Sequence, residues 1–334
     1  MGAGKFRFPV LVAHADWSVN ASKRWMALAF LDGGVRYRVG APRKVGDVET
    51  LLARLKSTVG SSGSVLLGFD FPIGLPYGYA ARCAVEDFLA LLPELGRGDW
   101  SKFYFPAEHP EEISLYRPFY PRRAGNARQV HLLEALGVKT MDDLRRRCEL
   151  AHPGRRAAAP LFWTLGGQQV GKAAISGWRD VLAPGLGSTE LAVTIWPFSG
   201  NLDELLAVDD LVIAETYPGE FYHHLGVTFQ ALNQSDGNSS RPRRGKRVQA
   251  SRAANARALL DWANYLGVLL STELELAIQD GFGPAKDGED AFDAIIGLFG
   301  MLNILLGKRS FCEPPGKQLR KIEGWILGQT LGFE

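Results

Sequence analysis

The chain has 334 residues, of which 38 are basic and 36 acidic, so its formal net charge is +2. This balance gives no overall field that would identify a nucleic-acid partner, and 46% hydrophobic residues are typical of a globular protein with a sizeable core. The three cysteines are far apart and form neither a disulfide framework nor a metal-binding motif. The first apolar stretch, residues 8–13, is too short for a secretory signal, and the longest, 294–306, is too short for a bilayer span. We therefore expect a cytoplasmic protein without membrane contact.

The N-terminal third predicts a compact mixed sheet. Residues 10–15, 24–31 and 35–39 have the apolar content of strands, and a glycine pair supplies the turn between the second and the third. Apolar residues at helical spacing predict a helix over 48–59, and 65–70 predicts a fourth strand. Because a helix precedes it, the fourth strand can lie parallel to the first.

The rest of the chain predicts a long insertion followed by a return to the sheet. Residues 95–210 are rich in Pro, Gly, Arg and Trp, which indicates a mostly helical and irregular segment. A strand is predicted over 211–216, a polar loop over 236–255 and a helix over 256–266. The apolar helix predicted over 289–306 should pack against the sheet.

Acidic residues end three of these strands and begin the last helix. Asp16 follows the first strand, Asp70 the fourth and Glu215 a later one, while Asp290 and Asp293 share one helical face because they are three residues apart. Taken singly, each acid has a structural explanation, since turns and the first turns of helices favour carboxylates. Carboxylates that converge repel one another unless a hard cation neutralises them. Their order in the chain therefore predicts one acidic site that holds Mg²⁺ or Mn²⁺.

Four stretches of the chain resemble the motifs of an uncharacterised prokaryotic family of predicted RNase H-like nucleases. The stretches are residues 14–18 (His-Ala-Asp-Trp-Ser), 68–76 (Gly-Phe-Asp-Phe-Pro-Ile-Gly-Leu-Pro), 214–218 (Ala-Glu-Thr-Tyr-Pro) and 287–294 (Asp-Gly-Glu-Asp-Ala-Phe-Asp-Ala). The acid pair in the last of them is also similar to the paired acids on the final helix of Holliday-junction resolvases. The resemblance covers both ends of the chain and not the insertion.

The resemblance implies a single RNase H-like α/β domain over residues 1–334. A mixed sheet flanked by helices would form the core, residues 1–94 and 205–334, and about 95–204 would form the insertion. The implied activity is that of a divalent-metal-dependent phosphodiesterase or nuclease, a hydrolase with two metal ions about 3.5–4 Å apart. The catalytic and metal-binding residues would be Asp16, Asp70, Glu215, Asp290 and Asp293, with Lys23 and Arg24 as phosphate contacts.

A second motif, residues 166–172, has the spacing of a phosphate-binding P-loop. Gln168 and Gln169 lie within it, and Lys172 would reach a phosphate. Residue 173 is alanine, so the hydroxyl that binds Mg²⁺ in a P-loop is missing. A phosphate-contacting turn and a purely structural loop both remain open. The motif keeps a nucleotide-dependent phosphotransferase, of the actin-like or sugar-kinase-like branch of the fold, as the first alternative. A non-catalytic binding protein is the second.

A run of basic residues lies between Asp236 and Asp261 without an intervening acid. Arg243, Arg244 and Arg247 are the members that we expect to contact a phosphate backbone, although charge runs in loops are often simply solvated. The candidate partners are therefore a nucleic acid or a small phosphoester. DNA, RNA and small-molecule substrates, and the oligomeric state, stay open.

Overall fold

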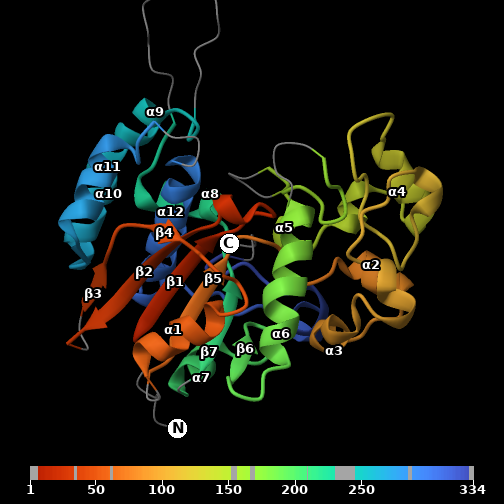
Figure 1. Ribbon diagram of the computed structural model, residues 1–334, viewed down its shortest axis with the longest axis horizontal. Coiled ribbons are helices and arrows are strands. Elements are labelled where there is room, and N and C mark those ends of the chain that lie inside the picture. Colours follow the sequence, from red (N-terminus) through yellow and green to blue (C-terminus); the bar gives the residue numbers. More distant parts are fainter. Residues whose placement is uncertain are drawn as a thin grey trace, which may run out of the picture.

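The structure is a computed structural model that describes residues 7–33, 36–60, 63–151, 156–165, 170–208, 210–229, 245–284 and 288–330. Within these residues, eight strands form one mixed sheet flanked by helices (Figure 1). The strands are β1 (Leu11–Asp16), β2 (Trp25–Asp32), β3 (Arg36–Val39), β4 (Arg43–Lys44), β5 (Val65–Phe69), β6 (Val193–Ile195), β7 (Leu211–Glu215) and β8 (Leu269–Leu270). Their order is β6-β7-β5-β1-β2-β3-β8, and β4 pairs with β2. The predicted α/β class with a mixed sheet is confirmed.

The centre of the sheet contains both antiparallel and parallel pairs, and the first and fourth predicted strands, β1 and β5, are parallel as expected. β2 runs antiparallel to both β1 and β3, whereas β5 runs parallel to β1 and β7 parallel to β5. Helix α1 (Leu51–Val59) precedes β5 in the chain and makes this parallel crossover possible. In the register of β1 and β5, Leu11 lies opposite Val65 and Ala15 opposite Phe69. The carboxyl ends of these two strands therefore meet at one edge of the sheet.

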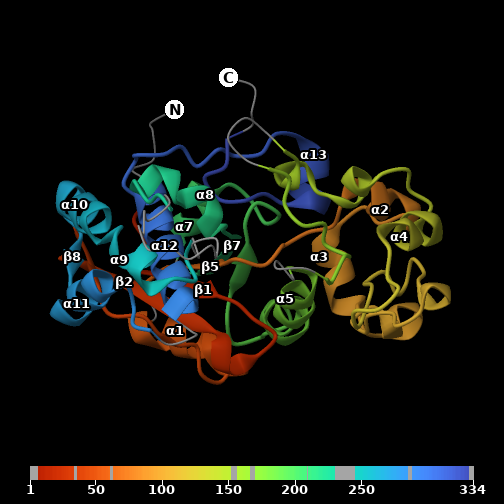
Figure 2. The same cartoon turned by 90° about the horizontal axis from the view of Figure 1, so that it is seen from above.

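The two faces of the sheet have separate cores. Helix α12 (Gly288–Leu305) covers one face and α1 the other, which is seen most clearly from above (Figure 2). Leu11, Ala13 and Ala15 of β1 belong to the core on the α1 side, and Val12 belongs to the core beneath α12. Because side chains alternate along a strand, Asp16 at the end of β1 faces α12.

Glycines let α12 lie close to the sheet. A Cβ atom added to Gly297 would stand 2.2 Å from the His14 ring of β1, and one added to Gly300 would stand 2.0 Å from the Phe221 ring. Carbon atoms cannot approach so closely without displacing the ring, so only glycine fits at these positions. The helix, and with it the acids in its first turns, is thereby held at a short distance from β1.

The chain between β5 and β6 forms most of the predicted insertion. It contains α2 (Tyr77–Arg82), α3 (Phe88–Leu91), α4 (Gln129–Leu136), α5 (Val170–Gly177) and α6 (Ala183–Leu186). In both views α2, α3 and α4 lie far from β1, β2 and β3 (Figures 1 and 2). The predicted boundary at residue 204 is too late, because β6 within this stretch pairs with β7 at the edge of the sheet. Three residues are too few for a strand to be found from an alternating pattern.

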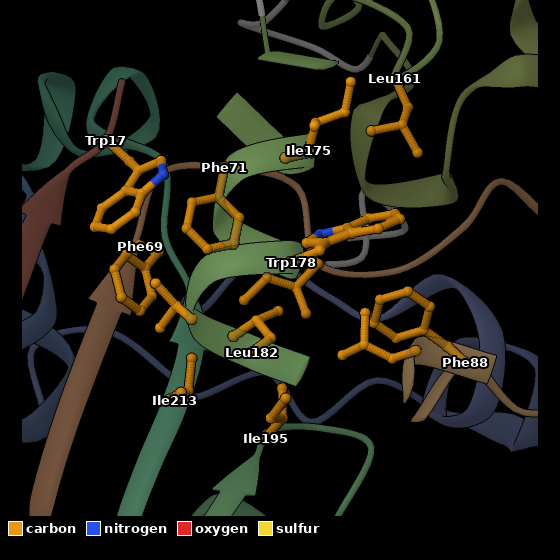
Figure 3. Packing of buried hydrophobic residues seen from close by; sticks show 14 of the residues in the cluster. Trp17, Phe69, Phe71, Phe88, Leu161, Ile175, Trp178, Leu182, Ile195 and Ile213 are labelled. Atoms are coloured by element: carbon orange, nitrogen blue, oxygen red, sulfur yellow. The ribbon is translucent and has the colours of Figure 1, made fainter. Parts of the chain in front are cut away.

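An aromatic core fastens the insertion to the sheet. Trp178, directly after α5, packs edge-on against Phe88 of α3 and lies near Phe71, which follows β5 (Figure 3). Its indole Nε1 also donates a hydrogen bond of 2.7 Å to the Pro72 carbonyl oxygen. Trp178 is therefore a core residue. This packing fixes α5 beside the loop that follows β5.

The remaining helices are α7 (Leu202–Ala207), α8 (Pro218–Phe221), α9 (Gln249–Ala253), α10 (Ala256–Leu266), α11 (Thr272–Asp280) and α13 (Gly316–Gln318). The helix predicted over residues 256–266 is confirmed as α10, and the predicted polar loop before it contains α9. In the described part of the chain, no helix combines the length and the apolar character that crossing a membrane requires.

Candidate functional site

Two parallel strands bring Asp16 and Asp70 together. Asp16 is the last residue of β1, and Asp70 directly follows β5. Ala15 pairs with Phe69, and the two acids are the residues that follow this pair. They therefore lie side by side at the carboxyl ends of the two strands. The two carboxyl groups lie close enough to interact, and the charge of Asp70 raises the pKa of Asp16.

Helix α12 adds two more aspartates to this edge. Asp290 and Asp293 lie near its N-terminus, and the Asp293 side chain is only 5% exposed. The charges of Asp70, Asp293 and Asp290 all act on Asp16. Asp16, Asp70, Asp290 and Asp293, four of the five acids predicted from the sequence, thus form one group, the aspartate cluster.

Burial and mutual repulsion raise the pKa values in the aspartate cluster. Burial is the largest cause of the raised pKa of Asp16, and the charges of its three aspartate neighbours raise it further. Burial likewise raises the pKa of Asp70 to about 7 and that of Asp290 to about 6. The ionised cluster is therefore destabilised in the absence of a cation, and a bound cation would relieve it.

Protein donors already hold part of the aspartate cluster. The backbone N–H of Trp17 donates to Oδ1 of Asp70 at 2.7 Å, and the Tyr222 hydroxyl donates to Oδ1 of Asp293 at 2.6 Å. The Lys246 ammonium donates to Oδ2 of Asp293. Neither Tyr222 nor Lys246 is among the site residues predicted from the sequence. They come from segments outside the strands and the final helix, so no periodic pattern places them here.

A cleft of about 740 Å³ adjoins the aspartate cluster and is lined by Asp16, Asp70 and Asp293. Lys23, in the turn after β1, and Lys172, near the start of α5, line the same cleft. Both lysines are predicted phosphate contacts, and the fold brings them to the acids from distant parts of the chain. The cleft thus combines carboxylates suited to a cation with ammonium groups suited to an anion.

Glu215, the fifth predicted acid, does not join the cluster. The Arg146 guanidinium donates to both of its carboxylate oxygens, at 2.5 and 2.6 Å, and the backbone N–H of Ile73 donates to Oε2 at 2.7 Å. The reason is strand alternation, because Glu215 has the parity of Leu211 and Ile213, which face the core opposite α12. Glu215 is therefore a buried structural acid and not a ligand of this cleft.

Two of the predicted arginine contacts, Arg24 and Arg247, interact with other groups of the protein. Arg24 donates to the backbone oxygens of Ser18 and Val19, and its guanidinium lies 4.1 Å from the centre of the Trp17 ring. It orders the turn that carries Lys23 and does not line the cleft. Arg247 lies 3.6 Å from Glu289 and is largely exposed. The other predicted contacts lie outside the described residues, namely Gln168, Gln169, Arg243 and Arg244.

The chemistry of the aspartate cluster fits a hard divalent cation such as Mg²⁺ or Mn²⁺. Its donors are carboxylate oxygens, which these ions prefer, and Oδ2 of Asp290 is buried without a hydrogen-bond partner in the described part of the chain. Across the same residues, no three His, Cys, Asp or Glu side chains already stand in a metal-binding arrangement. The donor set is therefore suitable, but an ion would draw the side chains closer together.

Fold and cleft together define the class of this protein: a mixed α/β protein with an acidic cleft at the carboxyl edge of its central strands. Comparison with protein-family models, curated proteins and solved structures gives no match to the chain. Its function is consequently inferred from the chemistry of the cleft.

The raised pKa of Asp70 predicts that the metal-free protein loses stability as the pH rises. Its folded pKa of about 7 exceeds the unfolded value near 3.8, so between these values the folded state binds a proton that the unfolded state does not. The stabilisation is complete below the unfolded pKa and is lost as the pH rises through the folded pKa. We expect the melting temperature in EDTA to fall between about pH 6.5 and 8, with a shallower slope in Asp70→Asn.

The range begins at pH 6.5 so that the titration of His14 does not contribute. Burial lowers the pKa of His14 to about 3, so below the unfolded histidine pKa, near 6.5, only the unfolded state takes up a proton. Stability would therefore fall as the pH falls below 6.5, which is opposite to the effect of Asp70. Equal slopes for the wild type and Asp70→Asn would contradict the prediction. Millimolar Mg²⁺ should raise the wild-type melting temperature more at pH 8 than at pH 6.5, because protons and the ion compete for the same carboxylates.

Proposed function

We propose that this protein is a divalent-metal-dependent phosphodiesterase or nuclease of RNase H-like type. The observation that carries the proposal is the convergence of four aspartates with raised pKa values, three of which line one cleft together with two predicted phosphate-binding lysines. The strand order β3-β2-β1-β5-β7, with β2 antiparallel to its neighbours, supports the RNase H-like part of the proposal. Acids at the ends of β1 and β5 and on the last long helix support it further.

The proposed reaction is hydrolysis of a phosphodiester. The oxygen of a water molecule bonds to phosphorus, the bond from phosphorus to the leaving oxygen breaks, and a phosphomonoester and an alcohol result. A bound divalent cation would supply a water of lowered pKa and would neutralise charge on the phosphate. The aspartate cluster would hold that ion. Lys23 and Lys172 would bind and orient the substrate phosphate, offsetting the charge that the carboxylates present to it.

The basic segment between Asp236 and Asp261 gives little support to a nucleic-acid substrate in its described part, residues 245–261. Arg252 is buried and donates to the carbonyl oxygens of Gly281 and Gly283, and Arg257 pairs with Asp261 at 2.8 Å. These side chains serve the fold. The contacts proposed for a phosphate are accordingly Lys23 and Lys172, which any phosphodiester of suitable size could use.

A phosphotransferase is the second candidate, because Lys172 and the aspartates line one cleft. A nucleotide phosphate held by Lys172 would lie near the carboxylates, as that reaction requires. Against it, Ala173 also lines the cleft where a P-loop has a hydroxyl.

Calorimetric titration separates the two candidates. We expect saturable Mn²⁺ binding, no saturable binding of ATP with Mg²⁺, and Mn²⁺-dependent hydrolysis of bis(p-nitrophenyl) phosphate or of single-stranded DNA or RNA. Lys23→Ala and Lys172→Ala should raise KM because they remove phosphate contacts. Absence of Mn²⁺ binding would refute the proposal. Saturable ATP binding that Lys172→Ala abolishes would favour the phosphotransferase instead.

A further inference from the structure

A protein cation already occupies part of the aspartate cluster. The Lys246 ammonium donates to Oδ2 of Asp293, and its Nζ atom lies 3.3 Å from Oε1 of Glu289. Its charge also acts on Asp16, Asp70 and Asp290. Lys246 is thus not a peripheral surface lysine, because its charge acts on every member of the cluster.

We propose that Lys246 takes the place of the second metal ion, so that the site binds one divalent cation and not two. The inference rests on the proposed function and goes beyond it, since a two-metal site is what the sequence predicts. Asp16, Asp70 and Asp290 would hold the ion, and Asp293 would hold the ammonium.

The contacts of Asp293 carry this division of roles. Its Oδ1 atom accepts the Tyr222 hydroxyl at 2.6 Å, and its Oδ2 atom accepts the Lys246 ammonium. Each of its oxygens therefore already has a protein donor. By contrast, Oδ2 of Asp290 is buried and has no partner among the described residues. Both oxygens of Asp293 accept hydrogen bonds from protein donors, whereas Oδ2 of Asp290 accepts none from the described residues. This difference is expected if one ion binds Asp290 and the ammonium of Lys246 binds Asp293.

The backbone of Lys246 is held in place by its surroundings. Its carbonyl oxygen accepts a hydrogen bond of 2.5 Å from the Arg252 guanidinium, which also donates to the Gly281 and Gly283 carbonyl oxygens. A Cβ atom on Gly288, the first residue of α12, would stand 2.7 Å from that guanidinium. Arg252 therefore ties the backbone of Lys246 to the beginning of the helix that carries Asp290 and Asp293, and it acts as a positioning residue.

The location of Lys246 also suits the role of a second cation towards the substrate. Lys246 lines the same cleft as Asp16, Lys23 and Lys172. Its ammonium can therefore donate to a phosphate oxygen from the side of Asp293. There it would neutralise negative charge on the leaving oxygen, which is the task that a second ion performs in two-metal sites.

The number of bound Mn²⁺ ions tests this inference. Calorimetry on the full chain should give one ion per wild-type chain and two per Lys246→Met chain, since methionine keeps the length of the side chain but frees Asp293. Lys246→Arg and the matched control Lys172→Met should each bind one. Electron paramagnetic resonance should show an isolated Mn²⁺ ion in the wild type and a coupled pair in Lys246→Met, because ions about 3.5–4 Å apart interact magnetically.

Two ions in the wild type, or one in Lys246→Met, would overturn the inference while leaving the metal site intact. No Mn²⁺ binding by the wild type would overturn both the inference and the proposed function, so the two failures are distinguishable. The wild-type count decides the matter even if Lys246→Met does not fold.

Discussion

Asp16→Asn is expected to reduce Mn²⁺-dependent phosphodiester hydrolysis by about 10³-fold, because a misplaced cation loses several kcal/mol of transition-state stabilisation and each 1.4 kcal/mol is tenfold in rate. Asp16 is buried and interacts with all three other members of the aspartate cluster. The measurement is the single-turnover rate at saturating substrate, together with the Mn²⁺ affinity.

The same substitution should leave the metal-free protein at least as stable as the wild type. Asparagine has the shape of aspartate without its charge, and the charge of Asp16 is disfavoured by burial and by its neighbours. Asp32→Asn is a matched control. Asp32 also ends a strand, but β2 is antiparallel to β1, so Asp32 lies at the end of the sheet where β1 begins. Its side chain pairs with the exposed Arg38. Equal activity of Asp16→Asn and Asp32→Asn would exclude the aspartate cluster as the catalytic site.

Arg146→Met is expected to destabilise the fold by about 3–5 kcal/mol, the usual cost of removing one partner from a buried ion pair. Arg146 is fully buried and donates to Glu215, to Glu149 and to the carbonyl oxygen of Ile73. Without it, two buried carboxylates lose their counter-charge. Chemical denaturation with guanidinium chloride measures the effect as a shift in the midpoint.

Arg38→Met is the control for this prediction, because it breaks an exposed pair with Asp32 and should cost no more than about 1 kcal/mol. Adding Glu215→Gln to Arg146→Met should recover part of the loss, since it removes one of the unpaired charges. A midpoint for Arg146→Met no lower than that for Arg38→Met would contradict the prediction. Mn²⁺ affinity should fall as well, because Glu215 and Arg146 both bind the backbone of Ile73, in the loop that begins with Asp70.

Hydrophobic periodicity was sufficient to predict the central elements. Strands β1, β2, β3, β5 and β7 and helices α10 and α12 lie within a residue or two of their predicted ranges, because each buries apolar side chains over several residues. The short strands β4, β6 and β8 were missed, since two or three residues give no period and pair only where the rest of the sheet provides an edge.

The sequence by itself determined the α/β class and which acids end strands and open the last helix. It also offered Lys23 and Lys172 as candidate phosphate contacts, which stays a prediction. The class and the positions of the acids follow from local patterns of residue type and spacing.

The tertiary structure alone decided which of these residues meet. It separated Glu215 from the cluster, because the face on which a strand-end side chain lies depends on the core that the strand covers. It placed Lys246 and Tyr222 on Asp293, because loops and short helices are positioned by packing and not by a period of their own. The physical reason is that electrostatic interactions depend on the distance between two groups in the fold. The separation of two residues along the chain does not indicate that distance.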